Sequence, residues 1–90
     1  MTDPTDPTTA IIMYGTTWCF DSRRARRVFD ELEIPYEWID IDKDSDARQY
    51  VEEVNHGFRS VPTIIFPDGS ILVEPSNEVL REKLAELTRG

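Results

Sequence analysis

The chain is poor in cysteine and histidine and has no long hydrophobic run, and each of these scarcities excludes a class of protein. Its 90 residues include one cysteine and one histidine. One cysteine cannot close a disulfide within the chain, and no second cysteine or histidine lies at zinc-ligand spacing, so we expect neither a disulfide scaffold nor a metal site. No apolar stretch approaches the roughly 20 residues of a membrane span. A single thiol without a disulfide partner is typical of a cytoplasmic protein.

Basic residues are also scarce relative to acidic ones. The chain has 10 Lys and Arg against 18 Asp and Glu, and its net charge is −8. A field of this sign repels nucleic acids and anionic membranes, so neither is expected as a partner. Residues 1–9 carry neither the basic start nor the apolar middle of a signal peptide, so they are predicted to be a flexible tail. Residues 10–90 are long enough for one domain with a modest core.

Strand and helix patterns alternate along this domain. Apolar and β-branched runs predict strands over residues 10–14, 36–41, 61–66 and 71–73. Helical spacing of apolar residues predicts helices over residues 19–32, between the turn at 42–45 and the stop at 55–57, and from residue 75 onward. Residues 67–70 predict a hairpin turn. The order is β-α-β-α-β-β-α, and because a helix joins the first two strands, we expect them to be parallel, within a four-stranded mixed sheet of the α/β class.

The candidate functional residue is Cys19, which follows the first predicted strand and begins the first predicted helix. Aligned peptide dipoles and free N–H groups at a helix start stabilise a thiolate, the reactive form of cysteine. Asp21 opposes this effect, whereas Arg23 or Arg24 favours it. Because backbone dipoles are fixed and Asp21 can turn into water, we expect the thiolate to be stabilised overall. Ser22 stands where a second thiol would complete a Cys-x-x-Cys pair.

Three separated segments carry a resemblance to a known family. They are residues 14–19 (YGTTWC), residues 54–63 (VNHGFRSVPT) and residues 66–76 (FPDGSILVEPS). In this order they resemble the glutaredoxin form of the thioredoxin fold, and within it the actinobacterial mycoredoxins. The resemblance covers nearly the whole chain after the predicted tail. It implies a thioredoxin fold and a thiol–disulfide oxidoreductase.

The resemblance also implies roles for individual residues. Cys19 would attack a mixed disulfide between a protein and a low-molecular-weight thiol. Pro62 would be cis and lie beside the sulfur, and Val61 would offer its backbone N–H and C=O to an extended substrate. Because Ser22 cannot resolve an adduct on Cys19, a second small thiol must release it, which is the monothiol route. We therefore expect no tightly bound cofactor, and a small thiol as co-substrate.

Residues around Cys19 are expected to shape and tune the site. Trp18 and Phe20 would flank the substrate groove as an apolar docking face. Asp21 would tune the thiol, and Ser22 would do so by a hydrogen bond to the sulfur, unless it is only a residue of the first helical turn. The four arginines of the first helix are most often a solvated face, and Arg59 is the favoured anion-binding residue (Arg23 is the other with a plausible position).

The identity of the small thiol follows from two departures from the resemblance. Glutathione-binding glutaredoxins usually carry a lysine shortly before the cysteine, where this chain has Thr16. They also carry a Gly-Gly-x-Asp-like turn after the fourth strand, where residues 74–78 read EPSNE. Both anchors for glutathione carboxylates are weak or missing. We therefore expect mycothiol to be favoured over glutathione.

The sequence predicts a monomeric monothiol oxidoreductase whose partners are mixed disulfides of proteins or small molecules, and it leaves two alternatives open. One is iron–sulfur cluster binding across a dimer, as in glutaredoxins with a Cys-Gly-Phe-Ser site. Phe20 and Asp21 replace the small flexible pair of that site, so this alternative ranks second. The other is a non-catalytic interaction module, which an unreactive Cys19 would indicate.

Overall fold

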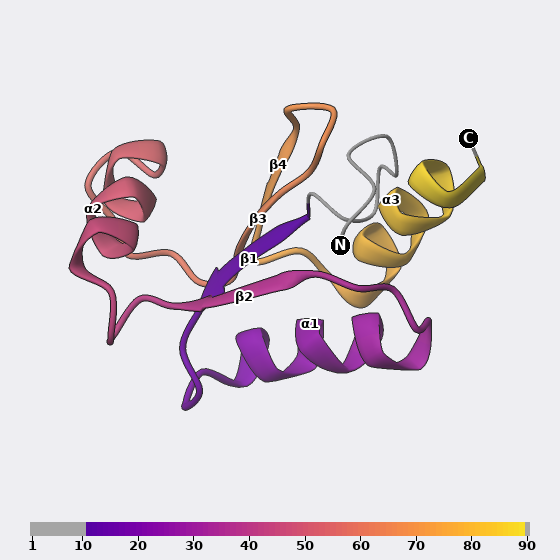
Figure 1. Cartoon of the computed structure of the whole chain (residues 1–90), viewed down its shortest axis with the longest axis horizontal. Helices are drawn as coiled ribbons and strands as arrows, with labels where there is room; N and C mark the ends of the chain where they lie inside the picture. Colours follow the sequence, from indigo (N-terminus) through magenta and orange to yellow (C-terminus); the bar gives the residue numbers. More distant parts are fainter. Residues whose placement is uncertain (1–10, 90) are drawn as a thin grey trace, which may run out of the picture.

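The structure is a computed structural model that describes residues 11–89, in which a four-stranded sheet is flanked by three helices (Figure 1). The predicted tail at residues 1–9 lies outside the described residues. No helix within residues 11–89 is long and apolar enough to cross a membrane. The elements are β1 (Ile12–Gly15), α1 (Phe20–Glu31), β2 (Glu37–Asp40), α2 (Ser45–Val54), β3 (Thr63–Ile65), β4 (Ile71–Val73) and α3 (Asn77–Arg89). Their order is the predicted one.

The sheet has the strand order β2-β1-β3-β4. Strands β1 and β2 are parallel, and the two pairs β1–β3 and β3–β4 are antiparallel. In the central strand, Tyr14 pairs with Ile39 of β2 and with Thr63 of β3. The predicted four-stranded mixed sheet of an α/β protein is therefore confirmed. The loop before β3 thus lies next to the end of β1, where Cys19 follows.

Helices cover both faces of the sheet, so the strands have apolar residues on both sides. Helices α1 and α3 cover one face, and their contact with β1 and β3 forms the larger core cluster: Ile11, Met13, Ala25, Val28, Phe29, Ile64, Phe66, Leu80 and Leu84. On the other face, α2 forms a smaller cluster of Ile41, Ala47, Val51 and Val61. Cys19 packs against this smaller cluster. The thiol therefore lies on the α2 side, at the edge of a packed core.

The predicted third strand is shorter than expected. Residues 61–66 were expected to be extended, but β3 spans Thr63–Ile65 only. Pro62 has no N–H to contribute to the ladder, and proline inside a sheet is confined to strand starts, edges and bulges. Val61 and Pro62 therefore belong to the loop before the strand, and they are buried in it.

Two predicted turns have the geometry that their residues favour. After α2, His56 and Gly57 adopt positive φ angles of 57° and 96°, and the Gly57 N–H donates to the Glu52 carbonyl at 2.6 Å. This is a glycine stop at the helix C-terminus. Between β3 and β4, Gly69 has a φ of 88°, and its N–H donates to the Phe66 carbonyl at 2.9 Å. The first turn leads into the loop that carries Val61, and the second closes the hairpin between β3 and β4.

Candidate active site at the start of helix α1

Cys19 is the N-cap residue of α1. Its φ of −78° and ψ of 125° are extended, and its carbonyl accepts the Arg23 N–H at 3.1 Å, the first hydrogen bond of the helix. The side chain is half-buried. The sulfur thus lies at the positive end of the helix, where the unpaired N–H groups of the first turn favour an anion. The expected placement of Cys19 is confirmed.

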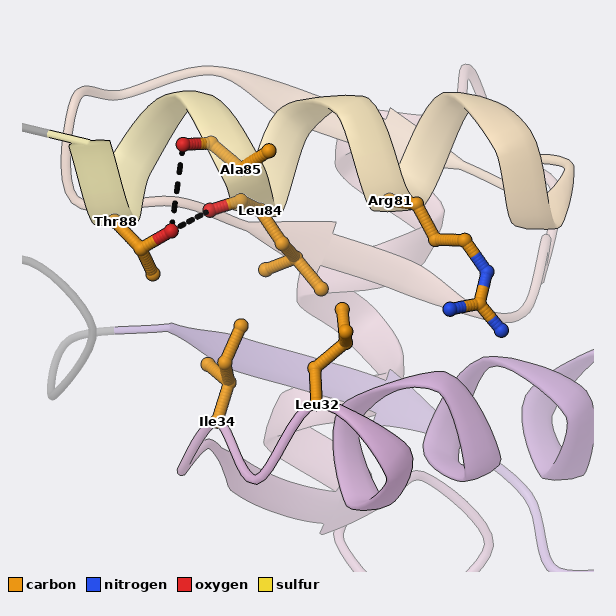
Figure 2. A pocket seen from close by; sticks show the side chains of 6 residues that line it. All are labelled: Leu32, Ile34, Arg81, Leu84, Ala85 and Thr88. Carbon is orange, nitrogen blue, oxygen red and sulfur yellow. Dashed lines mark hydrogen bonds between the residues drawn. The ribbon is translucent and has the colours of Figure 1, made fainter.

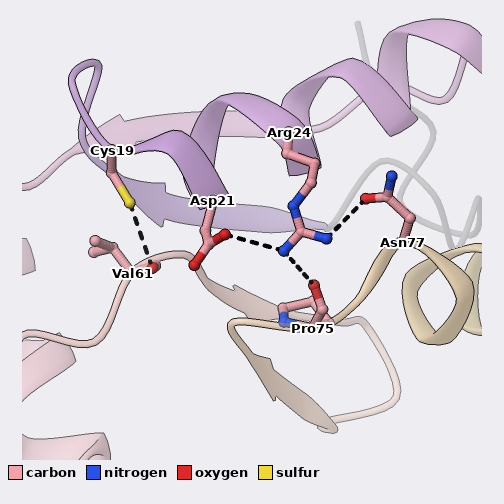
Figure 3. Close-up of polar contacts among 6 residues, drawn as sticks. All are labelled: Cys19, Asp21, Arg24, Val61, Pro75 and Asn77. Carbon is pink, nitrogen blue, oxygen red and sulfur yellow. Dashed lines mark hydrogen bonds and ion pairs between the residues drawn. The ribbon is translucent and has the colours of Figure 1, made fainter.

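The sulfur of Cys19 faces the loop before β3 (Figure 3). The thiol donates to the Val61 carbonyl oxygen, with 3.8 Å between Sγ and O. The peptide bond between Val61 and Pro62 is cis, as the resemblance implied. The Pro62 carbonyl accepts the Glu74 N–H at 2.9 Å, so the loop is tied to the segment after β4. A backbone edge is therefore held beside the only thiol of the chain.

Ser22 is completely buried beneath the site. Its Oγ accepts the Thr16 N–H at 3.4 Å. A Cβ added to Gly15 would lie 2.7 Å from this Oγ and 2.8 Å from two carbons of the Trp38 ring. Gly15 thus lets the start of α1 pack closely on the end of β1. Ser22 holds this contact, and its expected effect on the sulfur stays a prediction.

Asp21 and Arg24 form an ion pair of 3.1 Å on the first turns of α1 (Figure 3). The Arg24 guanidinium also donates to Asn77 Oδ1 at 3.3 Å and to the Pro75 carbonyl at 3.4 Å. In this arrangement Asp21 pairs with Arg24, whereas the sequence led us to expect that it can turn into water. Because Arg24 neutralises Asp21, the negative charge acts more weakly on the sulfur than its sequence position indicates. The expected tuning of the Cys19 thiol by Asp21 stays a prediction.

Three aromatic side chains are strongly exposed in the two chain segments that carry Cys19 and Val61. Trp18 is 70% exposed, Phe20 73% and Phe58 70%, and these are the most exposed large hydrophobic residues of the part that the structure describes. Trp18 and Phe20 flank Cys19 in the chain, and Phe58 lies in the loop that leads to Val61. The two segments meet at the contact between Cys19 and Val61, so their exposed aromatic residues indicate an interaction surface. Phe58 was not singled out from the sequence, although an aromatic residue three positions before a Val-Pro pair was the available signal.

Trp18 is oriented by a residue that the sequence placed only in a turn. Its indole N–H donates to Asp42 Oδ2 at 2.7 Å. The Asp42 N–H in turn donates to Asp40 Oδ1 at 2.9 Å, which fixes the turn after β2. Asp42 therefore has a second function as the acceptor that holds an exposed indole. Nothing in the local pattern of the sequence indicates this contact.

Arg59 lies in the same loop as Phe58. Its side chain is 61% exposed, and its Nε lies 3.8 Å from Glu52 Oε1 of α2. Such an exposed and long ion pair is weak. The guanidinium therefore remains accessible to an anion, and the expected binding role of Arg59 stays a prediction.

Tyr14 packs against the smaller core cluster on the α2 side, as Cys19 does. Its ring centroid lies 5.3 Å from that of Tyr50, and burial raises the pKa of Tyr14 above its ordinary value, with a smaller effect from the charge of Tyr50. The phenol is therefore neutral at physiological pH.

Within residues 11–89, no group of three or more His, Cys, Asp or Glu side chains is placed to hold a metal ion.

A groove lies away from the thiol, between the C-terminal end of α1 and α3 (Figure 2). It has a volume of about 480 Å³, and Leu32, Ile34 and Leu84 form its apolar part. Arg81 lies at one end and Thr88 at the other. Cys19 lies at the opposite end of the 12-residue helix α1, so this groove is not part of the candidate site.

A thiol at a helix start, beside the backbone of a cis X–Pro bond on a four-stranded mixed sheet, defines the thioredoxin-fold class of redox proteins. Within that class, the family model described as Glutaredoxin matches residues 11–71. The chain therefore belongs to the glutaredoxin family. It is a glutaredoxin-family redox protein, and the predicted thioredoxin fold is confirmed.

Relatives and solved structures agree with this assignment. The chain is 36% identical over 80 residues to a Mycobacterium tuberculosis protein provisionally named a glutaredoxin, covering 89% of this chain and 95% of the relative. It is 37% identical over 65 residues to Mycoredoxin 1 of Corynebacterium glutamicum, covering 72% and 80% of the two chains. The glutaredoxin from Archaeoglobus fulgidus superposes with a TM-score of 0.64 at 28% identity, covering 89% and 86%. The wheat glutaredoxin, at 18% identity and a TM-score of 0.69 with 100% and 97% covered, shows the fold alone.

Proposed function

We propose that this protein is a monothiol thiol–disulfide oxidoreductase that reduces mixed disulfides between proteins and a low-molecular-weight thiol. The observation that carries the proposal is the position of Cys19, whose sulfur lies at the start of α1 and 3.8 Å from the Val61 carbonyl. Ser22 is the residue three places on, and the chain has no second cysteine. Exchange therefore has to run through one protein thiol.

The proposed reaction has two exchange steps. In the first, the Cys19 thiolate attacks the sulfur of the small thiol in the mixed disulfide, and the substrate protein leaves as a thiolate that takes up a proton. Cys19 then carries the small thiol as a new disulfide. In the second, another molecule of the small thiol attacks that adduct as its thiolate. Cys19 is released in its reduced form, and the two small thiols leave as a symmetrical disulfide.

The surroundings of Cys19 support binding of an extended substrate. The loop edge at Val61 offers backbone groups next to the sulfur, because Val61 and Pro62 lie outside β3. Trp18 and Phe20 on either side of Cys19, and Phe58 three residues before Val61, supply exposed apolar surface. A substrate strand that pairs with Val61 would thus cover the aromatic side chains with its own side chains.

Mycothiol is the proposed small thiol in preference to glutathione. Thr16 occupies the position at which glutathione-binding relatives carry a lysine, and it is only 2% exposed, so it offers no charge to a carboxylate. Glu74 directly follows β4, and Glu78 lies in the first turn of α3. Both are exposed, and their charges repel carboxylates. The similarity to Mycoredoxin 1 of Corynebacterium glutamicum supports the same choice.

The test is the rate at which the reduced protein removes mycothiol from a labelled mixed disulfide, with the glutathione adduct of the same peptide in parallel. We expect release of mycothiol to be faster, and to stop when Cys19 is replaced by serine. Equal rates with both adducts would contradict the thiol preference. No release from either would contradict the oxidoreductase and favour cluster binding or a non-catalytic module, which an absorbance spectrum of anaerobically purified protein distinguishes.

A further inference from the structure

The basic residues of this acidic protein are concentrated on one helix. Helix α1 carries Arg23, Arg24, Arg26 and Arg27, which are four of the 10 Lys and Arg residues in a chain of net charge −8. Arg24 is engaged with Asp21 and the start of α3. The other three line a hollow of about 260 Å³ on the surface of α1. We call Arg23, Arg26 and Arg27 the arginine face.

The arginine face is unfavourable for the helix by itself. Arg23 and Arg27 are four residues apart, and Arg23 and Arg26 are three apart, so their like charges repel one another on neighbouring turns. Arg23 also lies near the positive end of the helix, where cations are disfavoured. Asp30, the fourth residue of the hollow, offsets only part of this charge. An external anion would relieve the repulsion.

Arg26 is held in place for such a contact. Its Nε donates to the Tyr36 hydroxyl at 3.2 Å, and its Cζ lies 4.2 Å from the centroid of the Trp38 ring. Trp38 lies in β2 and Tyr36 directly precedes it, so the guanidinium is fixed against the sheet. Arg23 and Arg27 are exposed, and neither forms an ion pair within residues 11–89. One fixed and two adaptable cations thus share one hollow.

The arginine face begins next to the thiol. The Arg23 N–H donates to the Cys19 carbonyl, so Arg23 lies one helical turn from the sulfur-bearing residue. Arg27 lies a further turn away, about 12 Å from Cys19 along the helix axis at about 1.5 Å per residue. An extended peptide advances about 3 Å per residue, so a substrate bound at Cys19 reaches these arginines about two to four residues from its own cysteine.

We propose that the arginine face docks an acidic segment of the protein substrate, two to four residues from the cysteine that carries the small thiol. The proposal rests on the proposed function and adds its substrate class: cysteines flanked by Asp and Glu. An acidic segment is the occupant because a few carboxylates complement three cations, whereas a nucleic acid carries negative charge well beyond the hollow and would be repelled by the net charge of −8.

The first test is binding without chemistry. A labelled acidic peptide with serine in place of its cysteine is titrated onto the reduced protein, with a lysine-rich peptide as comparison. The double variant Arg23→Glu/Arg27→Glu should weaken binding of the acidic peptide about tenfold or more, and raising salt from about 0.05 M to about 0.5 M should weaken binding to the unmodified protein. The matched control Lys43→Glu/Arg48→Glu has the same change in net charge on the α2 side, and it should change affinity less than about twofold.

Several outcomes overturn the docking proposal. If the two double variants lost equal affinity for the acidic peptide, the effect would come from net charge alone. If the acidic and lysine-rich peptides bound equally well, the arginine face would not recognise acidic residues. Displacement of the peptide by inorganic phosphate at matched ionic strength would assign the hollow to a small anion. Self-association of the unmodified protein that the Arg23→Glu/Arg27→Glu variant loses would assign it to a second copy of this chain.

The second test separates this proposal from the proposed function. Turnover is measured on two mixed-disulfide peptides, one neutral and one with acidic flanks. The single variant Arg27→Glu, which leaves Arg23 beside the thiol unchanged, should lower kcat/KM about fivefold for the acidic peptide and leave the neutral peptide within about twofold. If the unmodified protein turned over neither peptide, only the proposed function would be contradicted. The binding test with the serine-containing peptide would still report on docking. Equal kcat/KM for the two peptides in the unmodified protein would contradict docking only.

Discussion

The indole N–H of Trp18 donates to the Asp42 carboxylate at 2.7 Å, and this contact joins the turn before α1 to the turn after β2. Trp18 is 70% exposed, so little packing orients its ring. One charge-assisted hydrogen bond therefore holds a large apolar surface beside Cys19. This arrangement makes Asp42 a positioning residue of the candidate site.

Replacing Asp42 by alanine should release the indole and weaken substrate binding. We expect KM for a mixed-disulfide peptide to rise about threefold to tenfold with little change in kcat, because a hydrogen bond to a charged group contributes about 1.5–3 kcal/mol and only part of it is used in binding. Asp42→Asn keeps an acceptor and should retain most of the affinity. A change in kcat without a change in KM would argue against a positioning role, and the red shift of Trp fluorescence on release provides an independent readout.

Cys19→Ser should abolish thiol exchange completely, because serine cannot form a disulfide. The measurement is release of the labelled small thiol under conditions in which the unmodified protein turns over. Circular dichroism and thermal unfolding of the variant serve as the control for folding, since the Cys19 side chain is only half-buried. Any residual turnover above the background rate would show that the thiol of Cys19 is not the nucleophile.

Ser22→Cys should allow an internal disulfide with Cys19. The two positions are three residues apart at the start of α1, and the Ser22 side chain is already buried under the site, so a thiol there is shielded from other partners. Treatment with a mild oxidant should lower the mass by two hydrogens and consume both free thiols. Ser22→Ala is the matched control, because it keeps Cys19 but cannot form an internal disulfide. If the oxidised variant instead forms only intermolecular dimers, the start of α1 does not bring the two side chains together.

Gly15→Ala should destabilise the fold through a steric clash. The added Cβ would lie 2.7 Å from Ser22 Oγ and 2.8 Å from the Trp38 ring, closer than real contacts allow. We expect a loss of about 1–3 kcal/mol in the free energy of unfolding, measured by urea denaturation. Ser22→Ala in the same chain should recover part of this loss, because it removes one of the two clashing groups. An unchanged midpoint in the single variant would contradict the close packing of α1 on β1.

The ion pair between Asp68 and Lys83 should make stability depend on pH in the acidic range. A hydrogen bond from Lys83, with further hydrogen bonds from the Ser70 hydroxyl and N–H, holds the pKa of Asp68 well below its usual range. Because the folded pKa is lowered, the stabilisation is complete above the unfolded value of about 4 and is lost as the pH falls below it. Asp68→Asn should therefore lower Tm near neutral pH. The difference from the unmodified protein should shrink at about pH 2.

Much of the fold could be predicted because its signals are local. Helical spacing, the glycine stop at Gly57 and the Asp68–Gly69 turn each act over a few residues, and the structure contains all three. The resemblance added the cis bond before Pro62, and the predicted start of the first helix placed Cys19 correctly. The length of β3 was overestimated because an apolar run does not reveal where a proline leaves the ladder.

The sequence by itself determined the order of the elements, the single thiol, its place at a helix start and the serine three residues on. Only the tertiary structure decided what surrounds that thiol. Arg24 meets Asn77 across 53 positions of sequence, and Trp18 meets Asp42 across 24. The physical reason is range: periodicity, caps and turns depend on neighbouring residues, whereas these contacts depend on how helices and loops pack on the sheet.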